Sequence, residues 1–400
     1  MMSTQSVVDP ACEVRARRQV PYFRHGIGEE EIRAVCETLR SDWLTSGPRV
    51  KQFETDFSAF VEAPFAIAVT SGTAALRLAM EALGIGPGDE VLVPTMTFAS
   101  AIAVVLHLGA RPVFVDCTPD TLTMDPVDLQ HKITANSRVV VPMHYAGHPC
   151  DLDAVHEIAT AHHLRVVEDA AHAVTAAYKG KPIGSTSETS CFSFYANKTM
   201  TTGEGGMITT LNPDLAARMR LMTYHGINRN LLTSTGLKRW WRYEVVAPGF
   251  KDNLTDILAA IGVEQLKKAH AFRNARQRCA DLYREALDRV PGVRLPVSLP
   301  MVRHAWHMHV IQLQPDELAI SRDEFSLRLE EESVANSVHY LPLHLHKYYQ
   351  EAFNCQPTDC PVATAAYDRI LSLPIFPGLE EDDVAYVAEQ VRKLCLRYRR

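Results

Sequence analysis

Short apolar runs alternate with amphipathic stretches through the first half of the chain. Runs with the length and β-branched character of strands lie at residues 65–69, 90–93, 112–115, 138–142 and 164–168. Apolar residues at helical spacing occupy the stretches between them, at 73–83, 98–108, 125–133 and 151–163. This alternation predicts βαβ units. We therefore expect an α/β fold with a mainly parallel sheet that is flanked by helices on both faces.

The remaining pattern predicts a second, smaller unit. Two helices are expected before the first strand, at 29–40 and 50–60, and two shorter runs follow at 189–195 and 206–210. A polar stretch then leads to a long helical segment at 255–288 and an α+β end. We place a boundary near Pro248, which gives a large domain of residues 1–248 with an N-terminal arm at 1–20, and a small domain of residues 249–400.

Composition and charge exclude several classes of protein. The 41 Lys and Arg against 47 Asp and Glu give a net charge of −6, which argues against a dedicated nucleic-acid binder. Nine scattered cysteines with no CxxC pair and no Cys/His cluster predict reduced thiols and no metal site. The first residues lack a signal-peptide core, and no apolar stretch is long enough to span a bilayer. We expect a soluble, cytoplasmic protein that makes no contact with a membrane.

The first candidate for chemistry is the turn Ser71-Gly72-Thr73, between a predicted strand and an Ala/Leu-rich helix. Free N–H groups at a helix N-terminus, next to two hydroxyls, favour a phosphate group. Ordinary N-capping by Ser71 or Thr73 explains the same residues. The turn alone leaves both interpretations open.

The second candidate is Asp169, at the carboxyl end of an apolar strand and followed by small residues. A carboxylate that neighbouring N–H groups fix there is able to hold a proton on a heteroaromatic nitrogen. Another helix cap is the alternative. The third candidate is Lys198, which lies in an apolar, hydroxyl-rich segment just before a glycine-rich turn. Partial burial lowers the pKa of a lysine and makes it a nucleophile, although most lysines are simply surface residues.

The three candidates, taken in order with five further motifs, resemble the DegT-type sugar aminotransferases, which are fold-type I enzymes dependent on pyridoxal phosphate. The resemblance covers roughly residues 20–394. Its motifs are WLTSGP from Trp43, SGTAAL from Ser71, PTMTF from Pro94, EDAAHA from Glu168, SFYANK from Ser193, GEGG from Gly203, GFKDNLTD from Gly249 and HYLPLH from His339. It implies a large domain with a seven-stranded-type, mainly parallel sheet, and a smaller C-terminal domain.

The resemblance also implies roles for single residues. Lys198 resembles the lysine that forms the Schiff base with the cofactor and shuttles the proton, and Asp169 resembles the partner of the pyridinium nitrogen. His172 is expected near the ring hydroxyl and Phe98 over the ring, although both are also compatible with plain core positions. The residues implied in binding the phosphate are Ser71, Gly72, Thr73, Ser193 and, from a neighbouring subunit, Asn253. The expected enzyme is therefore a homodimer with shared active sites.

One departure from the family pattern is Tyr195, because many relatives carry His at this position. The departure bears only on fine substrate contacts. Lys198 is retained, whereas relatives that remove a sugar hydroxyl replace this lysine by His. The resemblance thus implies an enzyme that adds an amine.

The segment 225–248 suggests the substrate. Its basic and Trp residues suit a diphosphate and a nucleobase or sugar face, and a surface loop with packed Trp is the alternative. They are Arg229, Lys238, Arg239, Trp240, Trp241 and Arg242. His339, Tyr340 and His344 are further candidates for contacts with sugar hydroxyls, or else brace the two domains.

The insertion resembles the branch that acts on UDP-4-keto-pentose and 4-keto-6-deoxyhexoses. The expected reaction moves the amino group of L-glutamate to the 4-keto group of a nucleotide-linked sugar, with 2-oxoglutarate as the second product and ping-pong kinetics. A 3-keto sugar nucleotide or a cyclitol ketone is the alternative acceptor. A non-catalytic sensor of pyridoxal phosphate or a sugar nucleotide is a remote alternative. A Rossmann dehydrogenase is disfavoured because the first turn reads SGTAAL and not GxGxxG.

Overall fold

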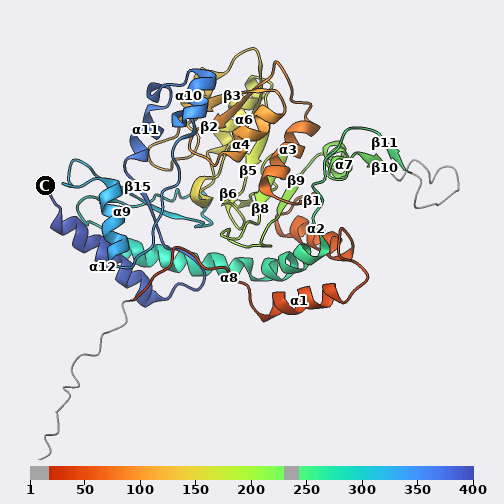
Figure 1. Cartoon of the computed structure of the whole chain (residues 1–400). Helices are drawn as coiled ribbons and strands as arrows, with labels where there is room; N and C mark the ends of the chain where they lie inside the picture. The colour runs from red at the N-terminus through yellow and green to blue at the C-terminus, as the bar shows by residue number, and fades with distance from the viewer. Residues whose placement is uncertain (1–17, 229–242) are drawn as a thin grey trace, which may run out of the picture.

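The computed structural model describes residues 18–228 and 243–400, and its centre is a seven-stranded sheet (Figure 1). The strand order is β1-β9-β8-β5-β4-β2-β3. β9 is antiparallel to both of its neighbours, and the other pairs are parallel. The strands are β1 (Phe65–Val69), β2 (Glu90–Pro94), β3 (Arg111–Val115), β4 (Ser137–Val140), β5 (Arg165–Asp169), β8 (Thr189–Ser193) and β9 (Gly206–Thr210). The predicted α/β fold is confirmed.

Two helices of this half precede the first strand and the others alternate with the strands, as the pattern predicts. They are α1 (Glu29–Leu39), α2 (Pro48–Phe60), α3 (Gly72–Ala82), α4 (Ser100–His107), α5 (Pro126–Lys132), α6 (Leu152–Ala161) and α7 (Pro213–Met222), with a 3₁₀ turn η1 (Tyr145–Gly147). Side chains of Asp125, Asp151 and Asn212 cap α5, α6 and α7. The prediction that a helix starts at Phe98 is wrong by two residues. Phe98 lies in the connection before α4, where no side chain caps the helix.

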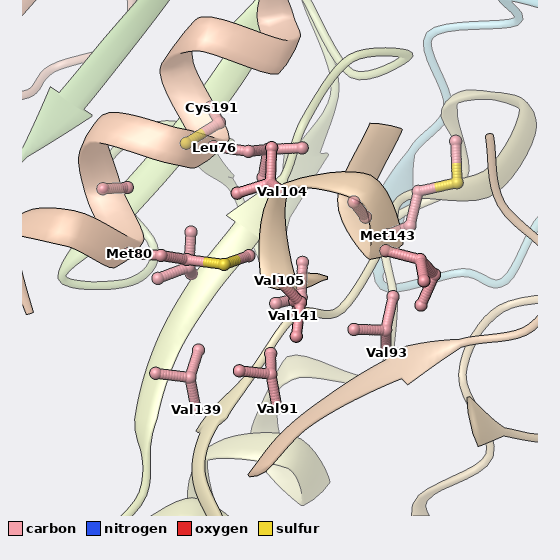
Figure 2. Packing of buried hydrophobic residues seen from close by; sticks show 14 of the residues in the cluster. Leu76, Met80, Val91, Val93, Val104, Val105, Val139, Val141, Met143 and Cys191 are labelled. Carbon is pink, nitrogen blue, oxygen red and sulfur yellow. The ribbon is translucent and has the colours of Figure 1, made fainter. Parts of the chain in front are cut away.

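The core that fixes the strand ends lies between the sheet and the helices α3 and α4. Leu76 and Met80 of α3 and Val104 and Val105 of α4 face valines of the central strands (Figure 2). These valines are Val91, Val93, Val139 and Val141, and all four are fully buried. Burying a side chain of this size stabilises the fold by about 2 kcal/mol. The strand ends, and the turns that follow them, therefore have fixed positions.

The C-terminal half is built on α8 (Asp256–Leu287), which runs past the large sheet between α1 and the rest of the molecule (Figure 1). The other helices are α9 (Arg322–Glu331), α10 (Lys347–Phe353), α11 (Pro361–Tyr367) and α12 (Glu381–Arg397), with 3₁₀ turns η3 (Leu343–Leu345) and η4 (Pro357–Asp359). A three-stranded sheet joins β12 (Val293–Arg294), β14 (His309–Leu313) and β15 (Ile370–Leu373). Short strands β6 (Ala177–Tyr178), β7 (Lys181–Pro182) and β13 (Val302–Arg303) form another sheet, and β10 (Ile227–Asn228) pairs with β11 (Glu244–Val245).

The chain near the predicted boundary returns to the large sheet. After Pro248, the backbone N–H of Thr70 donates to the carbonyl of Asp252 (2.9 Å), and Asn253 bridges to Val69 at the edge strand β1. The division at 248/249 stays a prediction. Of the predicted N-terminal arm, residues 1–17 lie outside the described residues, and Val20 is buried and pairs with Val334.

Three findings concern only the part of the chain that the structure describes. None of its helices is long and apolar enough to cross a membrane. Within residues 18–228 and 243–400, no three His, Cys, Asp or Glu side chains are grouped so that they could hold a metal ion. The eight described cysteines are free thiols.

Candidate active site

A cavity of about 450 Å³ brings together residues that lie far apart in the sequence. Its walls come from the N-terminus of α3, the carboxyl end of β5, the end of β8 with the loop that follows, and the stretch before η3. Ten predicted site residues line it: Ser71, Gly72, Thr73, Phe98, Asp169, His172, Ser193, Lys198, His339 and Tyr340. The strand ends of a parallel sheet thus form the site, as expected for this fold class.

One end of the cavity is suited to a phosphate. Ser71 caps α3, because its Oγ accepts a hydrogen bond from the N–H of Ala74 (3.0 Å), and its own O–H still has a proton to donate. A Cβ atom at Gly72 would lie 2.9 Å from the Cβ of Ser193, so glycine is what lets the β8 hydroxyl approach the helix end. Capping and anion binding are therefore compatible here. The positive end of the helix dipole and two hydroxyls meet in one place.

Lys198 lies in the loop between β8 and β9, where its backbone N–H donates to the carbonyl of Tyr195 (2.9 Å). Burial lowers the pKa of the amine to about 8, although the nearby Asp169 carboxylate acts in the opposite direction. With that pKa, about a tenth of the amine is neutral at pH 7, compared with well under a thousandth for an ordinary lysine. The side chain is therefore ready to act as a nucleophile or a base.

Asp169 ends β5 and faces the same cavity. Burial raises the pKa of its carboxyl group, and the N–H of Ala171, which donates to Oδ1 (3.0 Å), and the charge of Lys198 partly offset this. A buried acid whose pKa is raised gains stability from a cation placed beside it. A protonated ring nitrogen is such a cation, so the acid fits the pyridine end of pyridoxal phosphate.

His172 and Tyr340 form the wall between these two groups and the C-terminal half. The hydroxyl of Tyr340 lies 3.2 Å from Nε2 of His172, and the buried Nδ1 of His172 has no hydrogen-bond partner among the described residues. Burial, and then the charge of Lys198, lowers the pKa of His172 well below its usual value. A neutral imidazole at this position is able to exchange a hydrogen bond with a ring hydroxyl.

Phe98 and His339 lie at the rim of the cavity. The Phe98 side chain is 61% exposed, with its ring centroid 6.2 Å from that of Tyr340, so it is available to cover a planar ligand. His339 binds the hydroxyl of Ser372 through Nδ1 (2.9 Å), and burial lowers its pKa to about 4. His344, in contrast, is fully buried against Thr95 and Thr364, and does not line the cavity.

Asn253 does not line this cavity in the same chain. It lies in a larger hollow of about 970 Å³ with Trp43, Ser46 and Lys251, which does not include Lys198. Its Nδ2 donates to the Oγ of Ser46 (2.7 Å), and its Oδ1 accepts from Lys251. Five predicted substrate contacts lie outside the described residues, together with Trp241: Arg229, Lys238, Arg239, Trp240 and Arg242.

Other residues of the wall were not predicted as site residues. Tyr195, named above only as a departure from the family pattern, is 48% exposed at the cavity, and the buried Oδ1 of Asn197 has no partner among the described residues. Both lie in the same motif as Lys198, and Glu204 lies in the following glycine-rich turn, so closeness in sequence was the available signal. Met143 follows β4, whose end faces the site from the next strand of the sheet.

The fold and the paired Lys198 and Asp169 define the class of a pyridoxal-phosphate-dependent aminotransferase. Residues 25–392 match the DegT/DnrJ/EryC1/StrS aminotransferase family, and the chain belongs to this family. The chain is thus an aminotransferase of the sugar aminotransferase type, and pyridoxal phosphate is its cofactor.

Similar proteins span nearly the same length. The spore coat polysaccharide biosynthesis protein SpsC of Bacillus subtilis is 44% identical over 376 residues, which are 94% of this chain and 97% of SpsC. The PMP form of the putative sugar aminotransferase Spr1654 from Streptococcus pneumoniae superposes with a TM-score of 0.89 at 31% identity, over 94% of this chain and 99% of that one. DesV of S. venezuelae, in complex with a ketimine intermediate, has a TM-score of 0.86 at 33% identity, over 94% and 98% of the two chains.

Proposed function

We propose that this chain transfers the amino group of L-glutamate to the 4-keto group of a nucleotide-linked sugar. The products are a 4-amino-4-deoxy or 4-amino-4,6-dideoxy sugar nucleotide and 2-oxoglutarate. The observation that carries the amino transfer is the amine of Lys198, whose pKa is lowered to about 8, facing the same cavity as the buried acid Asp169. Pyridoxal phosphate, when bound, supplies the electron sink for the carbon that loses its proton.

The chain's own residues divide the work. When pyridoxal phosphate is bound, Nζ of Lys198 would hold it, and the neutral amine would take the proton from the donor Cα and deliver one to the sugar carbon. The carboxylate of Asp169 keeps the ring nitrogen protonated. Ser71, Thr73 and Ser193 would donate hydrogen bonds to the phosphate of the cofactor, and Phe98 and Tyr340 would shield its ring from water.

The sugar acceptor has two supports. The family is named as an aminotransferase family, the structural neighbour Spr1654 is named as a putative sugar aminotransferase, and the name of SpsC places that relative in the biosynthesis of a polysaccharide. The nucleotide and the 4-keto position rest on the resemblance of the segment 225–248 to one branch of the family, with Arg229, Lys238, Arg239, Trp240 and Arg242 as the proposed contacts. His339 and Tyr340 are the proposed contacts inside the cavity. Because the chain is an aminotransferase, the sensor alternative is dropped.

The test is a panel of acceptors with L-glutamate as the donor. UDP-, dTDP- and GDP-linked 4-keto sugars are compared with 3-keto sugar nucleotides and a cyclitol ketone, and products are identified by mass spectrometry and NMR. We expect amination at C4 and stoichiometric 2-oxoglutarate. If only a 3-keto sugar or a cyclitol is aminated, the proposed acceptor is wrong. If another amino acid supports turnover and L-glutamate does not, the proposed donor is wrong. Lys198→Ala protein is the negative control.

We also propose that two chains share each active site. Asn253 lies away from the cavity of its own chain, on a half-buried surface beside the hollow that Trp43 and Lys251 line. The neighbouring hairpin exposes Tyr243, Val245 and Val246, as is typical of a surface that packs against another protein. A second copy that covers this surface would receive the Asn253 amide at its phosphate site.

Mixed dimers test this arrangement. Lys198→Ala protein is co-expressed with Asn253→Asp protein, in which the new carboxylate would repel a phosphate. If each site takes its lysine from one chain and residue 253 from the other, one of the two sites in a mixed dimer is intact, and activity returns to about half of the wild-type value per dimer. A mixed dimer without activity would show that Lys198 and Asn253 serve the same chain's site, and mass measurement in solution checks that dimers form.

A further inference from the structure

A second buried histidine, His307, lies directly behind His172. The centroids of the two rings are 4.2 Å apart, with 38° between their planes. His307 does not line the cavity and lies 135 residues further along the chain, just before β14. Its Nδ1 is buried and has no hydrogen-bond partner among the described residues, as is true of the Nδ1 of His172. The short centroid distance brings the rings of His307 and His172 into close, tilted contact.

The backbone holds this contact closely. The N–H of Ala305 donates to the carbonyl of Gly147 (2.9 Å), and the N–H of Met308 donates to the carbonyl of Ala146 (3.2 Å). A Cβ atom on Gly147 would lie 2.9 Å from the carbonyl oxygen of His172 and 3.1 Å from the backbone nitrogen of His307. Glycine is thus what allows the two histidine segments to approach each other.

Trp306 turns the chain so that His307 faces the site. Its φ is 52°, which is a left-handed conformation that costs free energy for a bulky side chain. Neighbouring contacts hold it there: its ring stacks on His304 with centroids 4.0 Å apart, and its Nε1 donates to the side chain of Gln277 (2.9 Å). Strain that is so firmly held indicates that the direction of the next side chain matters.

Arg276 of α8 holds the same turn by hydrogen bonds to its carbonyl groups. Its fully buried guanidinium donates through Nη1 to the carbonyls of Trp306 (3.2 Å), His307 (3.0 Å) and Ile375 (2.8 Å). Burying a charge costs free energy, and hydrogen bonds to converging carbonyl oxygens offset part of that cost. These hydrogen bonds fix the backbone of His307 on the side away from His172.

We propose that His307 is a positioning residue, whose ring face fixes the orientation of His172 so that Nε2 of His172 points to Tyr340 and to the cofactor. This rests on the proposed role of His172 beside the cofactor ring. Without a flat partner, the imidazole of His172 is free to rotate about its χ2 torsion, and its hydrogen bond at the cavity is lost for part of the time.

The electrostatic surroundings keep both rings neutral. Burial lowers the pKa of His307 and of His172 well below the usual value, and the charge of Lys198 acts on both in the same direction. Arg276 adds to the effect on His307, and His144 adds to the effect on His172. The other titratable groups facing the pair are His339 and the hydroxyl of Tyr340. The pair therefore consists of two uncharged rings in tilted contact.

A double-mutant cycle tests whether His307 acts through His172. His307→Leu fills the space without a flat face, and it is made in the wild-type and in the His172→Asn background. The readouts are the dissociation constant of pyridoxal phosphate and the visible absorbance of the bound cofactor between pH 6 and 9. We expect His307→Leu to weaken binding roughly tenfold in the wild-type background and less than about twofold in the His172→Asn background. Equal losses in both backgrounds would overturn the proposal.

Two further variants separate positioning from folding. His307→Phe restores a flat ring, so its affinity and spectrum should return to near the wild-type values, and a variant as damaged as His307→Leu would count against the stacking role. His309→Leu is the matched control, because His309 is also buried but packs on Tyr283 and Trp306 instead of His172. We expect it to lower the unfolding midpoint without a change in the cofactor spectrum. If it changes the spectrum as much as His307→Leu does, the effect is only structural.

The wild-type protein separates this proposal from the proposed function. If borohydride does not attach the cofactor to Lys198, the proposed function fails. If Lys198 is labelled but the cycle is additive, only the role of His307 fails. If His307→Leu protein does not fold, His307→Phe in the two backgrounds completes the test: a tenfold loss for this planar variant would overturn the proposal, and retention within about twofold would support it.

Discussion

Two neighbouring carboxylates at the end of β5 have opposite surroundings. Glu168 and Asp169 are both buried, but successive side chains of a strand point to opposite faces of the sheet. Burial raises the pKa of Glu168, but hydrogen bonds from His144 Nε2 (2.8 Å) and the Thr186 hydroxyl (2.8 Å) more than offset this, and its pKa lies below the usual value. Burial also raises the pKa of Asp169, where the partners only partly offset it.

The difference lies in how many hydrogen-bond partners the described residues supply to each acid, and it supports the proposed cofactor-binding role of Asp169. Around Glu168 the chain itself supplies the donors, and even Nδ1 of His144 is used, since it accepts from the N–H of Cys150 (3.1 Å). Around Asp169 the chain supplies one backbone donor at Oδ1, and the carboxylate borders the cavity. A buried group that the fold leaves short of partners marks the place of a ligand better than burial alone.

The largest effect on activity should come from Lys198→Ala, because Lys198 lines the same cavity as Asp169. Without the amine, no group in the cavity can form the covalent bond to the cofactor or move the proton, so we expect amino transfer to fall by at least about a thousandfold. Borohydride reduction followed by peptide mapping should find no labelled peptide around residue 198. Far-UV circular dichroism should stay unchanged, because the replaced side chain faces a cavity.

Asp169→Asn should come next. An amide cannot keep the ring nitrogen protonated, so we expect kcat to fall by about a hundredfold while the protein still folds. Single-turnover kinetics with L-glutamate measure this loss. A variant with nearly full kcat would show that the raised pKa of Asp169 reflects packing and not cofactor binding.

Glu168→Gln should lower the stability of the protein more than its catalytic rate, in contrast to Asp169→Asn. The amide loses the charge that His144 and Thr186 surround, and we expect the free energy of unfolding to fall by about 2 kcal/mol. Urea denaturation with an unchanged m-value measures this loss. The single-turnover rate should stay within a few-fold of the wild-type rate. A kinetic loss as large as that of Asp169→Asn would erase the distinction between the two acids.

The smallest effect is a dependence on pH. Lys198 with a pKa of about 8 is protonated below that value, so the rate at which the cofactor-free enzyme captures pyridoxal phosphate should rise roughly tenfold from pH 6 to 7 and level off above pH 8. Stopped-flow absorbance follows the capture. Asp169→Asn removes the negative charge that favours the ammonium form, and should move the midpoint to lower pH, whereas Glu168→Gln should leave it in place.

Much of this comparison could be predicted from the sequence. The strand and helix periods located β5 and its neighbours, and the ordered motifs marked Asp169 and Lys198, because both lie at strand ends or in the loops that follow. Phe98 was assigned to a helix because apolar residues continue through it, although the helix begins only at Ser100. The motif that ends at Phe98 nevertheless predicts its place over the cofactor ring, and Phe98 does line the cavity.

The parts that could not be predicted depend on packing between distant segments. Glu168 and Asp169 are adjacent acids in the same motif. Their different surroundings become visible only from the position of His144 beside Glu168. His307 belongs to an apolar stretch with no site motif, and its contact with His172 arises from the approach of a segment to Gly147. The resemblance places Asn253 at the phosphate of a neighbouring subunit, which stays a prediction, and the pairing of residues 251–253 with the sheet edge and with Tyr224 accounts for its distance from its own chain's cavity.

The long helix α8 restricts how the enzyme can move. Its 32 residues make a rod of about 48 Å. Near one end Asp256 accepts hydrogen bonds from the first turn of α2, and near the other Tyr283 belongs to the same apolar cluster as Val387 of α12. Gly262, the residue most able to bend the rod, is pressed against Phe53. A rotation of the two halves about a hinge within α8 would therefore have to break this continuous helix.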